Sequence, residues 1–168
     1  GATLRPHGHH PWRTSPARPI FLPMTTPPAS FPTDPLDGIV RLSHLLGAET
    51  RLVQPGGGNT SIKVTLPDGA GGEVPALLVK GSGTDLKTIG REGFTRLSLP
   101  RLAPLATRDQ MSDADMMRFM AGAMLADGPA PSVETPLHSL LPHTVIAHTH
   151  DVATMSLTNI PDGTAERL

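Results

Sequence analysis

The chain has 168 residues, enough for one domain with its own hydrophobic core. Its 14 basic and 15 acidic side chains give a formal net charge of −1, and four Phe, one Trp and no Tyr leave few rings to stack on bases, so nucleic-acid binding is disfavoured. The absence of Cys excludes disulfides and thiolate sites, and no apolar run approaches the ~20 residues that cross a bilayer, so we expect a soluble, cytoplasmic domain without membrane contacts.

The first 33 residues form a proline-rich segment that differs in composition from the rest of the chain. Prolines recur every few residues there, and no acidic residue occurs before Asp34. Proline fixes φ and lacks an N–H donor, so this spacing excludes a helix and disfavours a strand. We expect residues 1–33 to be a disordered leader and residues 34–168 to form the folded domain.

The first helix is predicted to begin at Asp34-Pro35, where an N-cap residue precedes a proline at the first helical position. Apolar residues from Leu36 to Leu46 fall on one helical face, and Gly47 suits the end of the helix.

Three strands are predicted next. Alternation of apolar and polar residues indicates a strand over 60–66, which ends in a Pro-Asp-Gly turn. A short apolar run indicates a buried strand over 74–79, and a further strand is expected over 94–99.

The second half of the chain alternates between helical and strand patterns. Ser112 and Asp115 resemble a capping box, which opens a helix expected to end at Gly128-Pro129. Its apolar stripe is typical of core packing and consists of Met116, Met117, Met120 and Met124. A helix over 135–141, a strand over 144–147 and a helix over 151–158 complete an α/β or α+β domain.

The pair His148-Thr149-His150 is the sharpest chemical signal. It follows a β-branched apolar segment, and residues i and i+2 of a strand point to the same face, so both imidazoles can reach one metal ion. Two imidazoles suit Zn²⁺ or another first-row divalent ion, although His-x-His pairs also occur without a metal. We expect the nearby His138 and His143 to be structural.

Glu134 lies just upstream of these histidines, at the start of a predicted helix. A carboxylate beside a metal can be a ligand or a general base. It can equally be an ordinary first-turn glutamate favoured by the helix dipole.

Small residues form three turns that are rich in hydrogen-bond donors. The first, Gly56 to Ser61, could bind an anion through its backbone N–H groups, but it has neither Walker nor dinucleotide-binding spacing. The second is Gly81-Ser82-Gly83, and Ser132 belongs to the third.

In this order the motifs resemble the class II aldolase/adducin head family. The resemblance implies an α/β/α sandwich around a mostly antiparallel sheet. It also implies that Glu134 is the catalytic acid/base and that His148 and His150 are zinc ligands. The residues that match the family's phosphate-binding turns are Gly58, Asn59, Ser82, Gly83 and Ser132.

Within that family the amino-acid sequences of these motifs are most similar to those of the aldolase half of bifunctional rhamnulose-1-phosphate aldolase/alcohol dehydrogenases. That similarity implies cleavage of a phosphorylated sugar, a ketose 1-phosphate of the rhamnulose 1-phosphate type, to dihydroxyacetone phosphate and an aldehyde. It further implies Zn²⁺ or another divalent metal as cofactor and a homo-oligomer in the full-length protein. The family's third histidine ligand and its proton-donating tyrosine have no counterpart here, so we expect an amino-terminal portion, truncated at its C-terminus, that is inactive alone.

Two alternatives remain open within this resemblance. One is a sugar-phosphate epimerase or dehydratase of the same fold, which Glu134 disfavours because the epimerases carry Asp at that position. The other is an adducin-like interaction domain without chemistry, which has no need for an intact Glu134, His148 and His150 set.

Overall fold

The structure is a computed structural model that describes residues 32–160. The predicted leader, residues 1–33, lies almost wholly outside the described residues, so its disorder stays a prediction. Residues 161–168 lie outside them as well.

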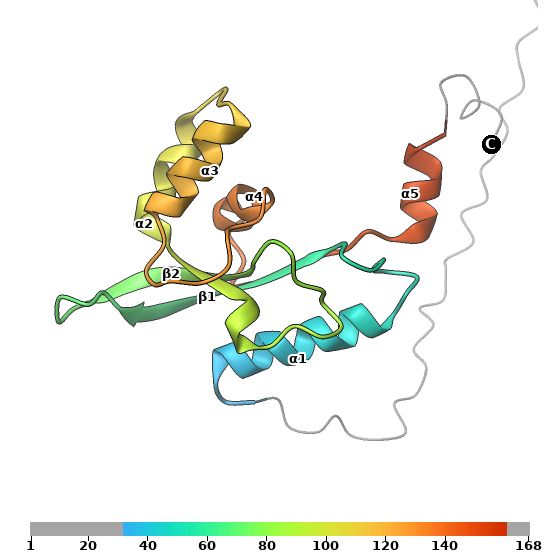
Figure 1. Ribbon diagram of the computed structural model, residues 1–168, viewed down its shortest axis with the longest axis horizontal. Helices are drawn as coiled ribbons and strands as arrows, with labels where there is room; N and C mark the ends of the chain where they lie inside the picture. Colours follow the sequence, from blue (N-terminus) through green and yellow to red (C-terminus); the bar gives the residue numbers. More distant parts are fainter. Residues whose placement is uncertain (1–31, 161–168) are drawn as a thin grey trace, which may run out of the picture. The chain divides into compact units, whose positions relative to one another are not determined.

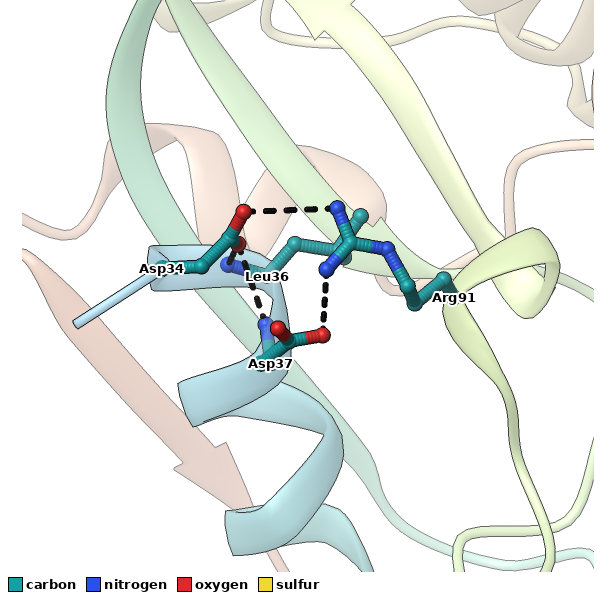
Figure 2. A network of polar contacts seen from close by, with 4 residues as sticks. All are labelled: Asp34, Leu36, Asp37 and Arg91. Carbon is teal, nitrogen blue, oxygen red and sulfur yellow. Dashed lines mark hydrogen bonds and ion pairs between the residues drawn. The ribbon is translucent and has the colours of Figure 1, made fainter. Parts of the chain in front are cut away.

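The first helix, α1, spans Pro35–Ala48 and begins where the sequence predicted. The Asp34 side chain caps it by accepting hydrogen bonds from the backbone N–H of Leu36 at 2.8 Å and of Asp37 at 3.2 Å. Arg91 pairs with Asp34 at 3.3 Å and also with Asp37, as Figure 2 shows. This network joins the start of α1 to the short 3₁₀ helix Arg91–Gly93 that precedes the third strand.

Four strands form one antiparallel sheet: β1 (Asn59–Pro67), β2 (Glu73–Lys80), β3 (Phe94–Ser98) and β4 (Val145–His148). Their order in the sheet is β3-β2-β1-β4. Every pairing is antiparallel, and each strand lies within about a residue of its predicted position.

Side chains of β2 alternate between two hydrophobic clusters, one on each face of the sheet. Leu77 packs with Leu97 and Met120 on one face, whereas Leu78 packs with Ile39 and Phe94 on the other. Helices therefore cover both faces. Figure 1 shows α1 on one side of β1 and β2, with α2 (Leu99–Leu102) and α3 (Asp113–Gly122) on the opposite side. The predicted α/β/α sandwich is confirmed.

The methionine-rich helix is shorter than predicted. The capping box is present, since Ser112 Oγ accepts from the N–H of Asp115 at 3.2 Å and contacts its carboxylate at 2.7 Å. However, α3 ends at Gly122, and the expected end at Gly128-Pro129 is wrong. The chain leaves the helix because Met124 forms a β-bridge with Leu97, a long-range pairing that helical periodicity does not reveal.

Prolines lie in the first turns of two short helices that the sequence analysis missed. Ser98 ends β3 and caps α2, whose first turn contains Pro100, and a 3₁₀ helix over Ala103–Thr107 follows.

The remaining helices are α4 (Thr135–Leu140) and α5 (Val152–Thr158), and Asp151 caps the latter. Among the described residues, no helix has the length and apolar character that crossing a membrane requires.

Core packing on the α3 face predicts a large effect for Leu77→Ala. Leu77 is fully buried against Leu97 and Met120, so truncation leaves a cavity, and we expect the free energy of unfolding to fall by about 2–5 kcal/mol. Denaturant unfolding measures this loss. The matched control is Leu45→Ala on α1, where the side chain is 57% exposed and the change should be small. Equal losses of unfolding free energy in both variants would contradict the placement of Leu77 in the core.

The α1 cap predicts a pH-dependent effect for Asp34→Asn. Backbone N–H groups of Asp37 and Leu36, and then Arg91, hold the pKa of Asp34 below its ordinary value of 3.8. A carboxyl with a lowered pKa stabilises the fold above its unfolded pKa, and this stabilisation is lost as the pH falls through the folded pKa. Asn can still cap the helix but lacks the charge. The Tm of the Asp34→Asn variant should therefore lie modestly below that of the unmodified chain at about pH 7, and this difference in Tm should disappear in strong acid. A gap that does not vary with pH would contradict this.

Candidate active site

Sheet register brings the start of β1 beside the end of β4. Asn59 is paired with His148, and Thr60 with Ala147, although these segments lie far apart in the sequence. Glu134 occupies the N-cap position of α4, and its side chain makes no capping hydrogen bond, which leaves its carboxylate available for other contacts.

The Glu134 carboxylate and two imidazoles converge on one point. Glu134 Oε1 lies 3.7 Å from His148 Nδ1 and 3.8 Å from His150 Nε2. The three potential ligand atoms all lie within 4.8 Å of one another. Ligands around a tetrahedral Zn²⁺ are separated by about 3.3 Å, so a small inward movement would suffice to hold an ion.

One atom of this cluster lacks a hydrogen-bond partner, as a metal ligand would. His148 Nδ1 is enclosed and has no hydrogen-bond partner. An enclosed nitrogen without a partner is costly, and a bound cation would satisfy it. The residues therefore fit a divalent metal, with Glu134 as a third potential ligand beside the two predicted histidines.

Only one of these histidines belongs to the strand. The prediction placed both at the end of a strand, where alternate side chains share a face, but β4 ends at His148. His150 lies beyond the strand, in the link to α5, and its ring centroid is 5.0 Å from that of His148. The loop conformation, rather than strand periodicity, therefore brings His150 to the cluster.

Asn59 orients the carboxylate. Its Nδ2 donates to Glu134 Oε2 and to Ser132 Oγ, both at 2.8 Å. These bonds use both hydrogens of the amide, so Glu134 is held with Oε1 toward the histidines. Asn59 and Ser132 were both predicted to bind phosphate, and the structure brings them together in contact with the predicted acid/base.

His138 supports the site from α4. Its side chain is fully buried, and Nδ1 lies 2.7 Å from Ser61 Oγ. Burial is the main cause and the nearby His148 a smaller one of a pKa for His138 that is lowered to about 4. The His138 ring is therefore neutral at neutral pH. It therefore adds no positive charge that would oppose a bound cation.

The small-residue turns pack around the cluster. Gly81 forms a β-bridge with Pro131, and the Ser82 N–H donates to the Ala130 carbonyl at 2.8 Å, which places this turn beside the segment that leads to Ser132. Gly83 has a φ of +78°, and a Cβ there would meet no neighbouring atom, so this side of the turn is open.

Gly58 allows the glycine loop to pack against the end of β4. Its φ is +73°, and a Cβ on it would lie 2.9 Å from the His148 carbonyl oxygen. A side chain at Gly58 would therefore disturb the histidine-bearing strand as well as the loop.

Two charged residues next to the turns were missed by the sequence analysis. Asp85 accepts hydrogen bonds at 2.8 Å from the backbone N–H of Gly56 and of Lys87, and these bonds lower the pKa of its carboxyl. Lys80, the last residue of β2, is 5% exposed. A lysine that closes a buried apolar strand is unusual, and that pattern could have identified it.

Comparisons with known proteins agree with this arrangement. A family model described as Class II Aldolase and Adducin N-terminal domain matches residues 37–166. A solved structure, described as the N-terminal Class II Aldolase domain of a conserved protein from Thermoplasma acidophilum, has 37% identity and a TM-score of 0.74 over 82% of this chain and 65% of its own. Uncharacterized oxidoreductase YuxG of Bacillus subtilis (strain 168) is 40% identical over 123 residues, which are 73% of this chain and 18% of that protein.

Proposed function

Because this chain belongs to the class II aldolase and adducin N-terminal domain family, we propose that its site performs metal-dependent aldol cleavage of a phosphorylated ketose. The observation that carries the proposal is the convergence of Glu134, His148 and His150, whose ligand atoms lie within 4.8 Å of one another. A non-catalytic domain would have no reason to keep an enclosed, unpartnered imidazole nitrogen beside a carboxylate.

In the proposed reaction, a carbon–carbon bond of the ketose breaks and its electron pair stays on the dihydroxyacetone phosphate half. A divalent ion, Zn²⁺ or a similar one, held by His148 and His150 would supply Lewis-acid stabilisation of the negative charge on the substrate oxygens. As the carbon–carbon bond breaks, the hydroxyl group on the carbon that becomes the aldehyde loses its proton to the surrounding water. Glu134 delivers the proton that the carbon of the dihydroxyacetone phosphate half takes up, so no net proton is gained or lost. This role is supported by the Asn59 hydrogen bond, which fixes one carboxylate oxygen of Glu134 and leaves the other facing the two imidazoles.

The proposed substrate is a ketose 1-phosphate of the rhamnulose 1-phosphate type, cleaved to dihydroxyacetone phosphate and lactaldehyde. Support comes from the donor-rich turns at Gly58 and at Ser82-Gly83. Gly58 packs against the His148 carbonyl, and the second turn lies beside the segment that leads to Glu134. Backbone N–H groups in glycine turns can bind a phosphate without side-chain rearrangement. Assembly into a homo-oligomer belongs to the same proposal.

Redox activity is not proposed for this chain. The word oxidoreductase describes a Bacillus protein of which the matched residues are 18%. The Gly56–Ser61 loop lacks the glycine spacing of a dinucleotide-binding fingerprint.

The decisive experiment combines metal analysis with product analysis on the full-length protein. We expect about one divalent ion per site and metal-dependent release of dihydroxyacetone phosphate from rhamnulose 1-phosphate. Conversion to an epimer or a dehydrated sugar would support the alternative reaction on the same fold. A metal-free protein that converts no ketose phosphate would support an adducin-like interaction domain and overturn the proposal.

A further inference from the structure

Helix α4 packs on the sheet through polar rather than apolar side chains. Its buried residues are Thr135 and His138, whereas Leu137 and Leu140 are 51% and 48% exposed. A surface helix normally buries its leucines and exposes its polar residues. Six residues are also too few for a helix that is stable by itself, so α4 depends on tertiary contacts for its position. The burial pattern therefore points to polar contacts as what fixes α4 along the sheet.

Two of these polar contacts join α4 to β1. Asn59 Nδ2 donates to Glu134 Oε2 at 2.8 Å, and Ser61 Oγ lies 2.7 Å from His138 Nδ1. Residues four apart in a helix are separated by about 6 Å along its axis, and residues two apart in a strand by about 6.7 Å. Because the two spacings match, both bonds form together only when α4 lies along β1 in this one register.

The alternation of side chains along β1 explains why these residues face α4. Figure 1 shows α4 on the side of the sheet opposite α1. Thr60 points the other way, where its hydroxyl lies 2.6 Å from a serine hydroxyl of α1. Lys63 shares the α4 face, and its ammonium donates to the carbonyl of Leu141, the C-cap residue of α4. The row Asn59, Ser61 and Lys63, here called the β1 ladder, thus contacts α4 at its start, middle and end.

The middle contact of the β1 ladder is the most enclosed. Ser61 and His138 are both fully buried, whereas Glu134 and Lys63 are partly exposed. An enclosed hydrogen bond has no water to replace it, so breaking it leaves a polar group unsatisfied. The other ring nitrogen, His138 Nε2, has no hydrogen-bond partner among the described residues. The ring therefore anchors α4 through Nδ1.

We propose that His138 is a positioning residue that, through Ser61, fixes α4 along β1 and thereby holds the Glu134 carboxylate in place for proton transfer. This rests on the proposed function of the same site. Glu134 is the N-cap residue of α4 and lies one turn before His138, so a shift of α4 along β1 moves the carboxylate with it. A misplacement of about 1 Å is enough to lower a rate by about 10²-fold.

The first test needs no activity and uses NMR on the 168-residue chain. It follows the side-chain amide of Asn59, whose two hydrogens are both donated within the site. Ser61→Ala removes the contact to His138, so the Asn59 amide signals should shift and its hydrogens should exchange with solvent at least about tenfold faster. The matched control is Ser43→Ala, which removes a buried hydroxyl contact to β1 from the α1 face and should leave these signals unchanged.

The second test compares two variants of His138 in the full-length protein. Asn places a polar atom near the position of Nδ1 and can keep the bond to Ser61, whereas Leu cannot. His138→Leu should therefore lower kcat by at least about tenfold, with KM and the metal content at saturating metal unchanged, and His138→Asn should restore most of the loss. Ser61→Ala should lower kcat similarly, and the double variant should lose no more, because both residues act through one bond.

A purely structural role of His138 predicts a different result. In that case His138→Leu would lose turnover only in proportion to its unfolded fraction, as expected for the core variant Leu77→Ala at the same Tm, and His138→Asn would restore nothing. Either result would overturn the proposal, as would unchanged Asn59 signals in Ser61→Ala. Were His138→Leu to unfold, the smaller change Ser61→Ala and the His138→Asn variant would decide. If the unmodified protein cleaves no ketose phosphate, the proposed function fails, and the Asn59 signals alone decide whether His138 positions Glu134.

Discussion

Replacing Glu134 by Gln is expected to lower kcat for aldol cleavage by about 10²–10⁴-fold, the usual contribution of a general acid or base. Gln has nearly the same shape, and its carbonyl oxygen can still accept the hydrogen bond that Asn59 Nδ2 donates at 2.8 Å. It cannot, however, carry the proton that the reaction moves. His148 and His150 remain, so metal content at saturating metal should be retained.

Two measurements separate the possible roles of Glu134. Steady-state kinetics gives kcat, and elemental analysis of the same sample gives the metal content. The matched control is Glu92→Gln, which changes an exposed glutamate in the 3₁₀ helix Arg91–Gly93 and should leave both values unchanged. Normal turnover in Glu134→Gln would exclude an acid/base role, and loss of metal would show that the carboxylate acts chiefly as a ligand.

His148→Ala is expected to abolish metal binding and activity together. Its Nδ1 is enclosed and faces Glu134 Oε1 at 3.7 Å, so removal of the ring takes away a ligand that no other described atom replaces. Removing a partner of a metal ligand costs about 10–100-fold in affinity, and removing the ligand itself should cost more. His150→Ala should behave in the same way, because its Nε2 lies 3.8 Å from that carboxylate oxygen.

Metal analysis after dialysis, followed by the cleavage assay with and without added metal, checks the histidine prediction. The matched control is His143→Ala, since His143 is an exposed residue just before β4 and does not belong to the group of potential ligands formed by Glu134, His148 and His150. A His148→Ala protein that keeps its metal, or that keeps turnover after losing it, would contradict the assignment.

Local sequence signals determined most of the secondary structure. Asp34 followed by Pro35 places the start of α1, because capping depends on the residues at the helix end and little else. Alternation places β1, and an apolar run places β2. The same logic failed at Met124, where apolar spacing continues but a β-bridge to Leu97 has replaced the helix.

The sequence by itself also determined which residue types are available for chemistry: a carboxylate, a His-x-His pair and three donor-rich turns. Only the tertiary structure decided how they act together. Antiparallel register sets Asn59 opposite His148, and the Asn59 amide then directs the Glu134 carboxylate toward both imidazoles. Burial of Lys80 likewise depends on what packs around the end of β2. These features arise from contacts between segments up to about ninety residues apart, and no local pattern encodes such contacts because periodicity reports only a residue's own element.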